Sequence, residues 1–82
     1  MKTVVLYGRD GCCLCDDAKA YLIGAGAGER FVLEERDIEA DDELLKRYLE
    51  RIPVVTVEGV EVFSLFVDEA EFERRIATVQ SR

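Results

Sequence analysis

The fold is decided in residues 2–25, which read KTVVLYGRDGCCLCDDAKAYLIGA. The run Lys2–Tyr7 is almost entirely apolar, which predicts a strand of the type buried on both faces. Residues 8–11 are turn formers, and from about Cys13 to Ala25 apolar residues recur at steps of three and four, which predicts a helix. The apolar residues that recur at this spacing are Leu14, Ala18, Tyr21, Leu22 and Ala25. A strand therefore leads into a helix, with the cysteines of the chain at the junction.

A second strand and a second helix are expected next. The strand opens at Phe31 and continues with weaker burial to Ile38. The helix begins at Asp41 or Asp42, because aspartate favours helix starts. The apolar positions of this helix are Leu44, Leu45, Tyr48 and Leu49.

The last third of the chain predicts a hairpin and a third helix. A strand begins at Pro53, and Glu58-Gly59 forms the turn to its partner, which runs from Val60 to about Phe66, because glycine accepts the positive φ of such turns. Asp68, with Glu71 three residues later, has the spacing of a capping box and starts the final helix. The buried stripe of that helix is expected at Phe72, Ile76 and Val79.

The order βαβ, then α, then ββα indicates one domain over residues 1–82. The βαβ unit must cross over right-handed with parallel strands, and the hairpin adds two antiparallel strands. The simplest solution is an α/β fold with a four-stranded mixed sheet and helices on both faces. This is the minimal thioredoxin fold.

Charge and hydropathy exclude several classes of partner. The net charge of −7 argues against nucleic acid, which needs a basic face to neutralise phosphates. No stretch approaches the roughly 20 apolar residues of a membrane span, and the start of the chain is too weakly apolar for a signal peptide. We expect a cytoplasmic monomer that binds neither nucleic acid nor membrane.

The three cysteines, Cys12, Cys13 and Cys15, lie within four positions, so they cannot staple distant parts of the fold. Such a cluster points to redox chemistry or to a metal. At a helix start, unpaired N–H groups and the helix dipole stabilise a thiolate, so the pKa of such a cysteine falls below the ordinary value of about 8.5. This assigns Cys12 as nucleophile and Cys15, about one helical turn later, as the more buried resolving thiol. Arg9 would add positive charge close to Cys12.

Residues 11–19, GCCLCDDAK, resemble the active site of the bacterial glutaredoxin-like family, whose members typically have Cys-x-Leu-Cys followed by Asp or Glu, Ala and Lys. Residues 51–55, RIPVV, resemble the proline-containing strand start of the same family. The resemblance covers essentially the whole chain and implies a thiol–disulfide oxidoreductase active in electron transfer. It also implies that Pro53, commonly cis in this fold, faces the dithiol across a groove and leaves the backbone of Ile52 free to pair with an extended substrate segment.

The resemblance implies a disulfide-containing protein or glutathione as the substrate, and a thiol reductase as a further partner. No bound cofactor is expected. Arg9 lies where a glutathione-contacting lysine often lies in this family. However, glutaredoxins proper carry a Gly-Gly turn before the last helix, where this chain has Leu65-Phe66-Val67-Asp68. Glutathione and a thioredoxin-reductase-like enzyme are therefore equal candidates for the reductant.

Two alternatives to an enzyme stay open. Three thiols in four positions could hold Cu(I), Zn²⁺ or an iron–sulfur cluster shared between two chains, although the lack of histidine and of a distant fourth cysteine disfavours a closed zinc site within one chain. The dithiol could also sense redox state in a non-catalytic adaptor. Cys13 is interpreted as a solvent-facing residue without a role.

Overall fold

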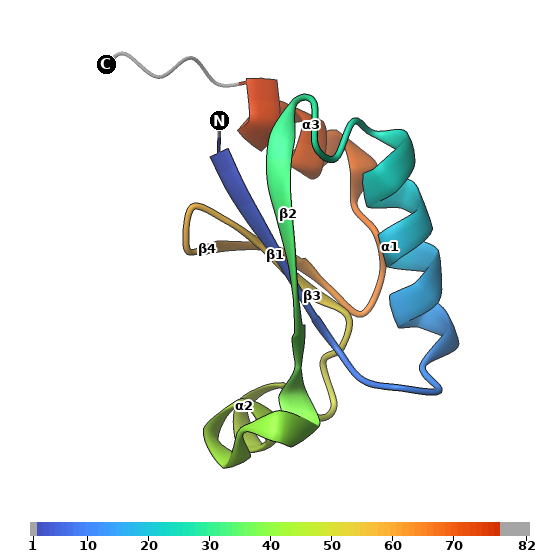
Figure 1. Cartoon of the computed structure of the whole chain (residues 1–82), viewed down its shortest axis with the longest axis vertical. Coiled ribbons are helices and arrows are strands. Elements are labelled where there is room, and N and C mark those ends of the chain that lie inside the picture. Colours follow the sequence, from blue (N-terminus) through green and yellow to red (C-terminus); the bar gives the residue numbers. More distant parts are fainter. Residues whose placement is uncertain (1, 78–82) are drawn as a thin grey trace.

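The computed structural model describes residues 2–77, which form an α/β domain (Figure 1). The elements are β1 (Lys2–Gly8), α1 (Cys13–Gly24), β2 (Phe31–Asp37), the 3₁₀ turn η1 (Ile38–Ala40), α2 (Asp42–Tyr48), β3 (Val54–Val57), β4 (Val60–Ser64) and α3 (Glu69–Ala77). Within these residues, no helix has the length and apolar character that crossing a membrane requires.

The four strands form one mixed sheet in the order β2-β1-β3-β4. β1 runs parallel to β2, with Lys2 opposite Phe31, and antiparallel to β3, with Tyr7 opposite Val54. The hairpin adds β4 antiparallel to β3, and its turn residues Glu58 and Gly59 have φ values of 53° and 83°. The predicted thioredoxin fold and the predicted hairpin turn are confirmed.

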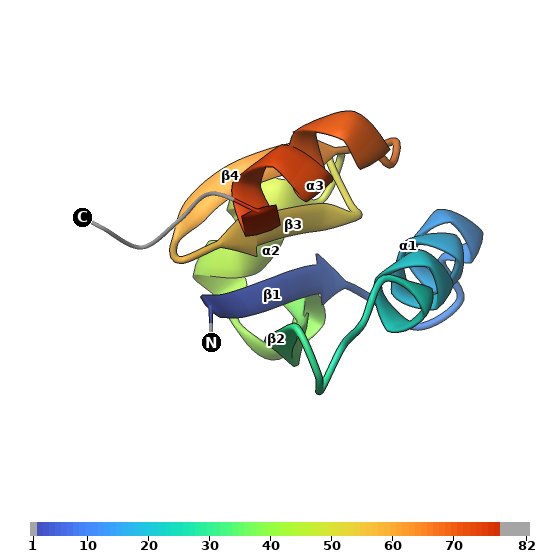
Figure 2. The same cartoon turned by 90° about the horizontal axis from the view of Figure 1, so that it is seen from above.

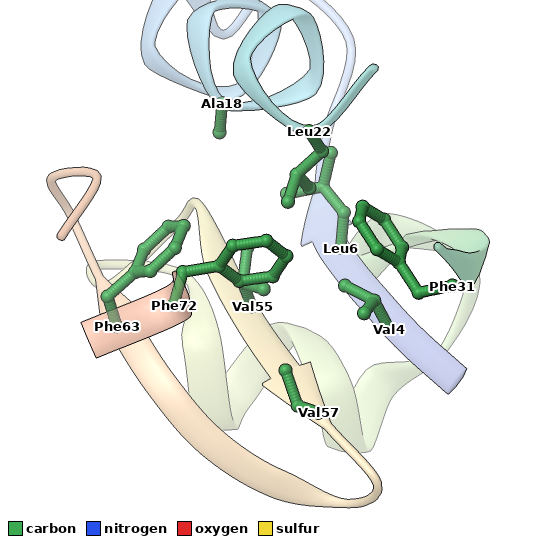
Figure 3. Close-up of a cluster of buried hydrophobic side chains, with 9 residues drawn as sticks. All are labelled: Val4, Leu6, Ala18, Leu22, Phe31, Val55, Val57, Phe63 and Phe72. Atoms are coloured by element: carbon green, nitrogen blue, oxygen red, sulfur yellow. The ribbon is translucent and has the colours of Figure 1, made fainter. Parts of the chain in front are cut away.

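Helices lie on both sides of the sheet, as predicted, but α2 meets it only at one end. α1 and α3 lie on one face, and α2 lies near the end of the sheet where β2 finishes (Figures 1 and 2). Alternate residues of one strand serve the two faces: Leu6 packs under α1, whereas its neighbour Tyr7 packs with Tyr48 at the end of α2. Figure 3 shows the larger cluster, which consists of Val4, Leu6, Ala18, Leu22, Phe31, Val55, Val57, Phe63 and Phe72.

The faces of two helices differ from the predicted ones in detail. Cys15, Ala18 and Leu22, at steps of three and four, are the buried residues of α1. Leu14 is one of the apolar residues at helical spacing, but it lies one position off this face and is 43% exposed. Leu49 follows the end of α2 and is also exposed. Two strand ends are shorter than predicted, since Ile38 belongs to η1 and β4 ends at Ser64.

The start of α3 confirms the predicted cap. The Glu71 N–H donates to Asp68 Oδ1 at 3.0 Å. This helix buries Phe72 completely and packs Ile76 against the larger cluster. Val79, the third predicted member of its stripe, lies outside the described residues.

Candidate functional site

Cys12 lies at the end of the loop that connects β1 to α1, directly before the first residue of the helix. Cys12 has an extended conformation (φ −93°, ψ 107°) and is the N-cap of α1. Its Sγ accepts a hydrogen bond from the Cys15 N–H at 3.1 Å. A sulfur in this position stands where a capping oxygen usually stands, next to the N–H groups that the helix leaves unpaired. The predicted position of Cys12 at the start of the helix, beside its unpaired N–H groups, is confirmed.

Cys12 and Cys15 form a disulfide, with their Cα atoms 5.2 Å apart. One helical turn separates the two residues, so the backbone of α1 already holds the sulfurs within reach of each other. The structure thus contains the oxidised form of a dithiol.

The two sulfurs differ in access to solvent. Cys15 is only 6% exposed and belongs to the smaller buried cluster, beside α2, whereas Cys12 is half-buried against the same cluster. Cys13 is exposed and has no disulfide partner among the described cysteines. A substrate disulfide, or a thiol that reduces the Cys12–Cys15 bond, therefore reaches Cys12 before it reaches Cys15.

Gly8, the last residue of β1, makes room for Cys15. A Cβ atom at Gly8 would stand 2.9 Å from Cys15 Sγ and 3.1 Å from Cys15 Cβ, closer than side-chain atoms normally approach. The backbone of Gly8 does not have the positive φ that calls for glycine elsewhere in the chain. Sequence reasoning treated Gly8 only as a turn former and missed this contact, although a glycine at the end of a strand that precedes such a cysteine motif is a visible signal.

Ile52 packs beside the dithiol, and Pro53 follows it in the chain. The Ile52–Pro53 peptide bond is cis, and Pro53 is fully buried. Ile52 belongs to the same buried cluster as Cys15, together with Tyr48 at the end of α2. The structure thus brings Cys12, Cys15 and Ile52 into one cluster, with the cis proline directly after it.

The expectation that the Ile52 backbone is free to pair with a substrate is wrong for its N–H group. This N–H donates to the carbonyl oxygen of Tyr48 at 3.1 Å, because the chain turns sharply between the end of α2 and Pro53 and the hydrogen bond closes that turn. Proline has no N–H group. The carbonyl oxygen is therefore the one group of the Ile52 backbone suited to pairing with a substrate.

Arg9 lies on the β2 side of the dithiol. Its guanidinium pairs with Glu39 at 3.4 Å, and Arg9 lines a pocket of about 350 Å³ together with Cys15. The ion pair between Lys19 and Glu35, at 3.2 Å, borders the same pocket. Of the residues that the structure describes, neither Ile52 nor Pro53 lines this pocket, so the structure does not bring Arg9 together with them.

A metal centre was one alternative for the three cysteines. In the part of the chain that the structure describes, residues 2–77, no three Asp, Glu, Cys or His side chains are grouped so as to hold a metal ion.

Comparisons with known proteins give the family of the chain and a solved structure of similar fold. The model of the Glutaredoxin-like domain (DUF836) matches residues 3–77. Among solved structures, the chain is similar to the solution NMR structure of protein Ne2328 from Nitrosomonas europaea, with 30% sequence identity and a TM-score of 0.79. That match covers 90% of this chain and 89% of the other. No curated protein matches the chain.

Proposed function

Since this chain belongs to the glutaredoxin-like domain family, we propose that it is a thiol–disulfide oxidoreductase in which Cys12 is the nucleophile and Cys15 the resolving thiol. One observation carries the proposal: the half-buried Cys12 caps α1 and is disulfide-bonded to the buried Cys15, one turn later. The arrangement supplies the anionic sulfur, the second sulfur and the difference in access that thiol exchange needs.

The reaction starts from the reduced dithiol. The Cys12 thiolate, stabilised by the Cys15 N–H and the start of α1, attacks one sulfur of a substrate disulfide. A mixed disulfide between Cys12 and the substrate forms, and the other substrate sulfur leaves as a thiolate. Cys15 then loses its proton and attacks Cys12 Sγ, which releases the second substrate thiolate. Two electrons pass to the substrate, and the chain is left with the Cys12–Cys15 disulfide.

Ile52 and Pro53 are proposed to orient the substrate. Ile52 packs in the same buried cluster as Cys15, and its carbonyl oxygen is proposed to accept one hydrogen bond from an extended substrate segment. Arg9, which forms an ion pair with Glu39 and lines the same pocket as Cys15, is proposed to contact the substrate on the β2 side.

The proposed substrates are protein disulfides, with glutathione or a thioredoxin-reductase-like enzyme as the source of electrons. No bound cofactor, nucleic acid or membrane takes part in the proposed reaction. The reductant is identified by comparing turnover with glutathione and its reductase against turnover with thioredoxin reductase and NADPH.

The roles of the cysteines are tested by single substitutions, assayed for insulin reduction with whichever reductase supports the wild type. Cys12→Ser should abolish turnover, because the attacking thiolate is lost. Cys15→Ser should accumulate a covalent adduct between Cys12 and the substrate, visible by mass spectrometry. Cys13→Ser is the matched control and should keep wild-type turnover. Turnover retained by Cys12→Ser would refute the assignment.

A further inference from the structure

The segment between β4 and α3, orange in Figure 1, exposes two large apolar side chains. Leu65 is 40% exposed and Phe66 is 71% exposed, the largest exposed fraction among the large apolar residues that the structure describes. Covering an exposed aromatic side chain with a partner lowers the free energy, because apolar surface leaves water. Aromatic residues are also enriched among the contacts that dominate protein interfaces.

The backbone fastens this segment to the cis proline. The Leu65 N–H donates to two carbonyl oxygens, those of Arg51 and Pro53, each at 3.0 Å. Leu65 has a φ of 68°, a left-handed conformation that is unfavourable for a residue with a Cβ atom. The chain thus keeps a strained leucine directly beside Pro53, and Pro53 follows Ile52 in the cluster that holds both redox cysteines. Phe66 therefore follows a residue whose backbone is bonded on both sides of Ile52, the neighbour of the dithiol.

The chemistry of this segment suits an apolar ligand and opposes an anion. The N–H of Leu65 is used within the chain, and the N–H of Phe66 donates to the Ser64 carbonyl oxygen at 2.8 Å, so neither is available to a carboxylate. Asp68 and Glu69 follow in the sequence, and the guanidinium of Arg51, whose carbonyl oxygen accepts from the Leu65 N–H, is paired with Glu61. Glutathione carries two carboxylates, whereas a polypeptide with an apolar side chain and a basic neighbour complements both the ring and the acidic residues.

We propose that Leu65 and Phe66 form a docking contact for a segment of a partner protein that carries an apolar residue, with a basic residue beside it, next to its disulfide-bonded cysteine. This inference rests on the proposed function and narrows its substrate class to protein disulfides. The apolar side chain packs on the Phe66 ring while the substrate sulfur meets Cys12. The basic residue faces Asp68 and Glu69.

Phe66→Ser tests the contact, and Ile23→Ser is the matched control. Ile23 is another well-exposed apolar residue, 56% exposed against 71% for Phe66, and lies near the far end of α1 from Cys12. Two disulfide-bonded peptides that differ only in leucine or serine beside the cysteine are compared with bis(2-hydroxyethyl) disulfide. For the leucine peptide, Phe66→Ser should lower kcat/KM by about tenfold, the size of one good interface contact, and Ile23→Ser should leave it unchanged. The serine peptide and the small disulfide should respond to neither substitution.

A binding readout separates this inference from the redox proposal. The leucine peptide with serine in place of its cysteines is titrated into the oxidised protein and followed by NMR at Leu65 and Phe66. Weaker binding to Phe66→Ser supports the docking contact even if the wild type turns over no disulfide, a result that would overturn only the redox function. Equal losses with all three disulfides, or unchanged binding in Phe66→Ser, would overturn the docking contact.

Discussion

At the scale of single residues, Gly8 at the end of β1 packs so closely against Cys15 that a side chain there would press on the redox pair. The disulfide fixes Cys15 Sγ 2.9 Å from the place of a Cβ atom at Gly8. In the reduced protein that sulfur is released from Cys12 and can rotate away. A methyl group at Gly8 should therefore crowd the oxidised form more than the reduced form.

Gly8→Ala should raise the reduction potential of the pair, on the order of 30 mV for a tenfold change in the two-electron equilibrium. The potential is measured by equilibration with glutathione buffers and thiol trapping. Gly24→Ala is the control, because a Cβ atom there meets nothing within 4 Å. Equal potentials in the two variants would show that the contact at Gly8 does not act on the disulfide.

The pairing of Cys12 with Cys15 was predictable, because the spacing of one helical turn already brings their sulfurs together. The contact at Gly8 was not predictable in the same way, because a packing distance depends on how far α1 stands from the sheet. The same holds for Arg9. The sequence indicates a positive charge near the dithiol, but only the fold brings the Glu39 carboxylate within 3.4 Å of the Arg9 guanidinium.

At the scale of elements, the cap at Asp68 controls how α3 closes the core. The capping hydrogen bond to Glu71 begins the helix that places Phe72 in the larger cluster. The same residue ends the segment that exposes Phe66. The helix start therefore matters both for stability and for the shape of the proposed docking contact.

Asp68→Ala should lower the free energy of unfolding by about 1 kcal/mol, the usual loss for an N-cap side chain. Urea unfolding of the oxidised protein measures it, with an unchanged slope and a lower midpoint. Glu50→Ala, which removes an exposed carboxylate outside the helices, should leave the midpoint unchanged. Matching midpoints for the two variants would contradict the role of the cap.

Most elements were predictable because local signals agree with the tertiary fold, as at the Glu58-Gly59 turn and the Asp68 cap. The exceptions lie where tertiary contacts override local pattern. Leu65 adopts a left-handed conformation that leucine does not favour, since its N–H serves the carbonyl oxygens of Arg51 and Pro53. Leu14 matches the helical period but lies off the buried face that Cys15 joins.

At the scale of the whole molecule, the disulfide lies outside the larger cluster and closes only a short loop. The larger cluster, which joins α1, α3 and the sheet, contains neither cysteine of the pair. A bond that closes a loop of four residues restricts the unfolded chain by about 2 kcal/mol in the loop-entropy model, against about 3 kcal/mol for a loop of 15 residues. The position of the pair at a helix start is thus better explained by chemistry than by stability.

The topology was predictable because the right-handed βαβ rule and the short hairpin leave few arrangements for four strands. The surroundings of the dithiol needed the structure. The cis bond at Pro53 and the hydrogen bond from the Ile52 N–H to Tyr48 both depend on how α2 meets β3, which no local pattern records.

In the reduced protein, the start of α1 should keep the sulfur of Cys12 anionic. The most direct test of this effect is the pH dependence of Cys12 alkylation by iodoacetamide, resolved by peptide mass spectrometry, in the folded chain and in the chain unfolded by urea. The half-maximal rate in the folded chain should occur at least about one pH unit lower. Half-maximal rates at the same pH in both states would contradict the claim.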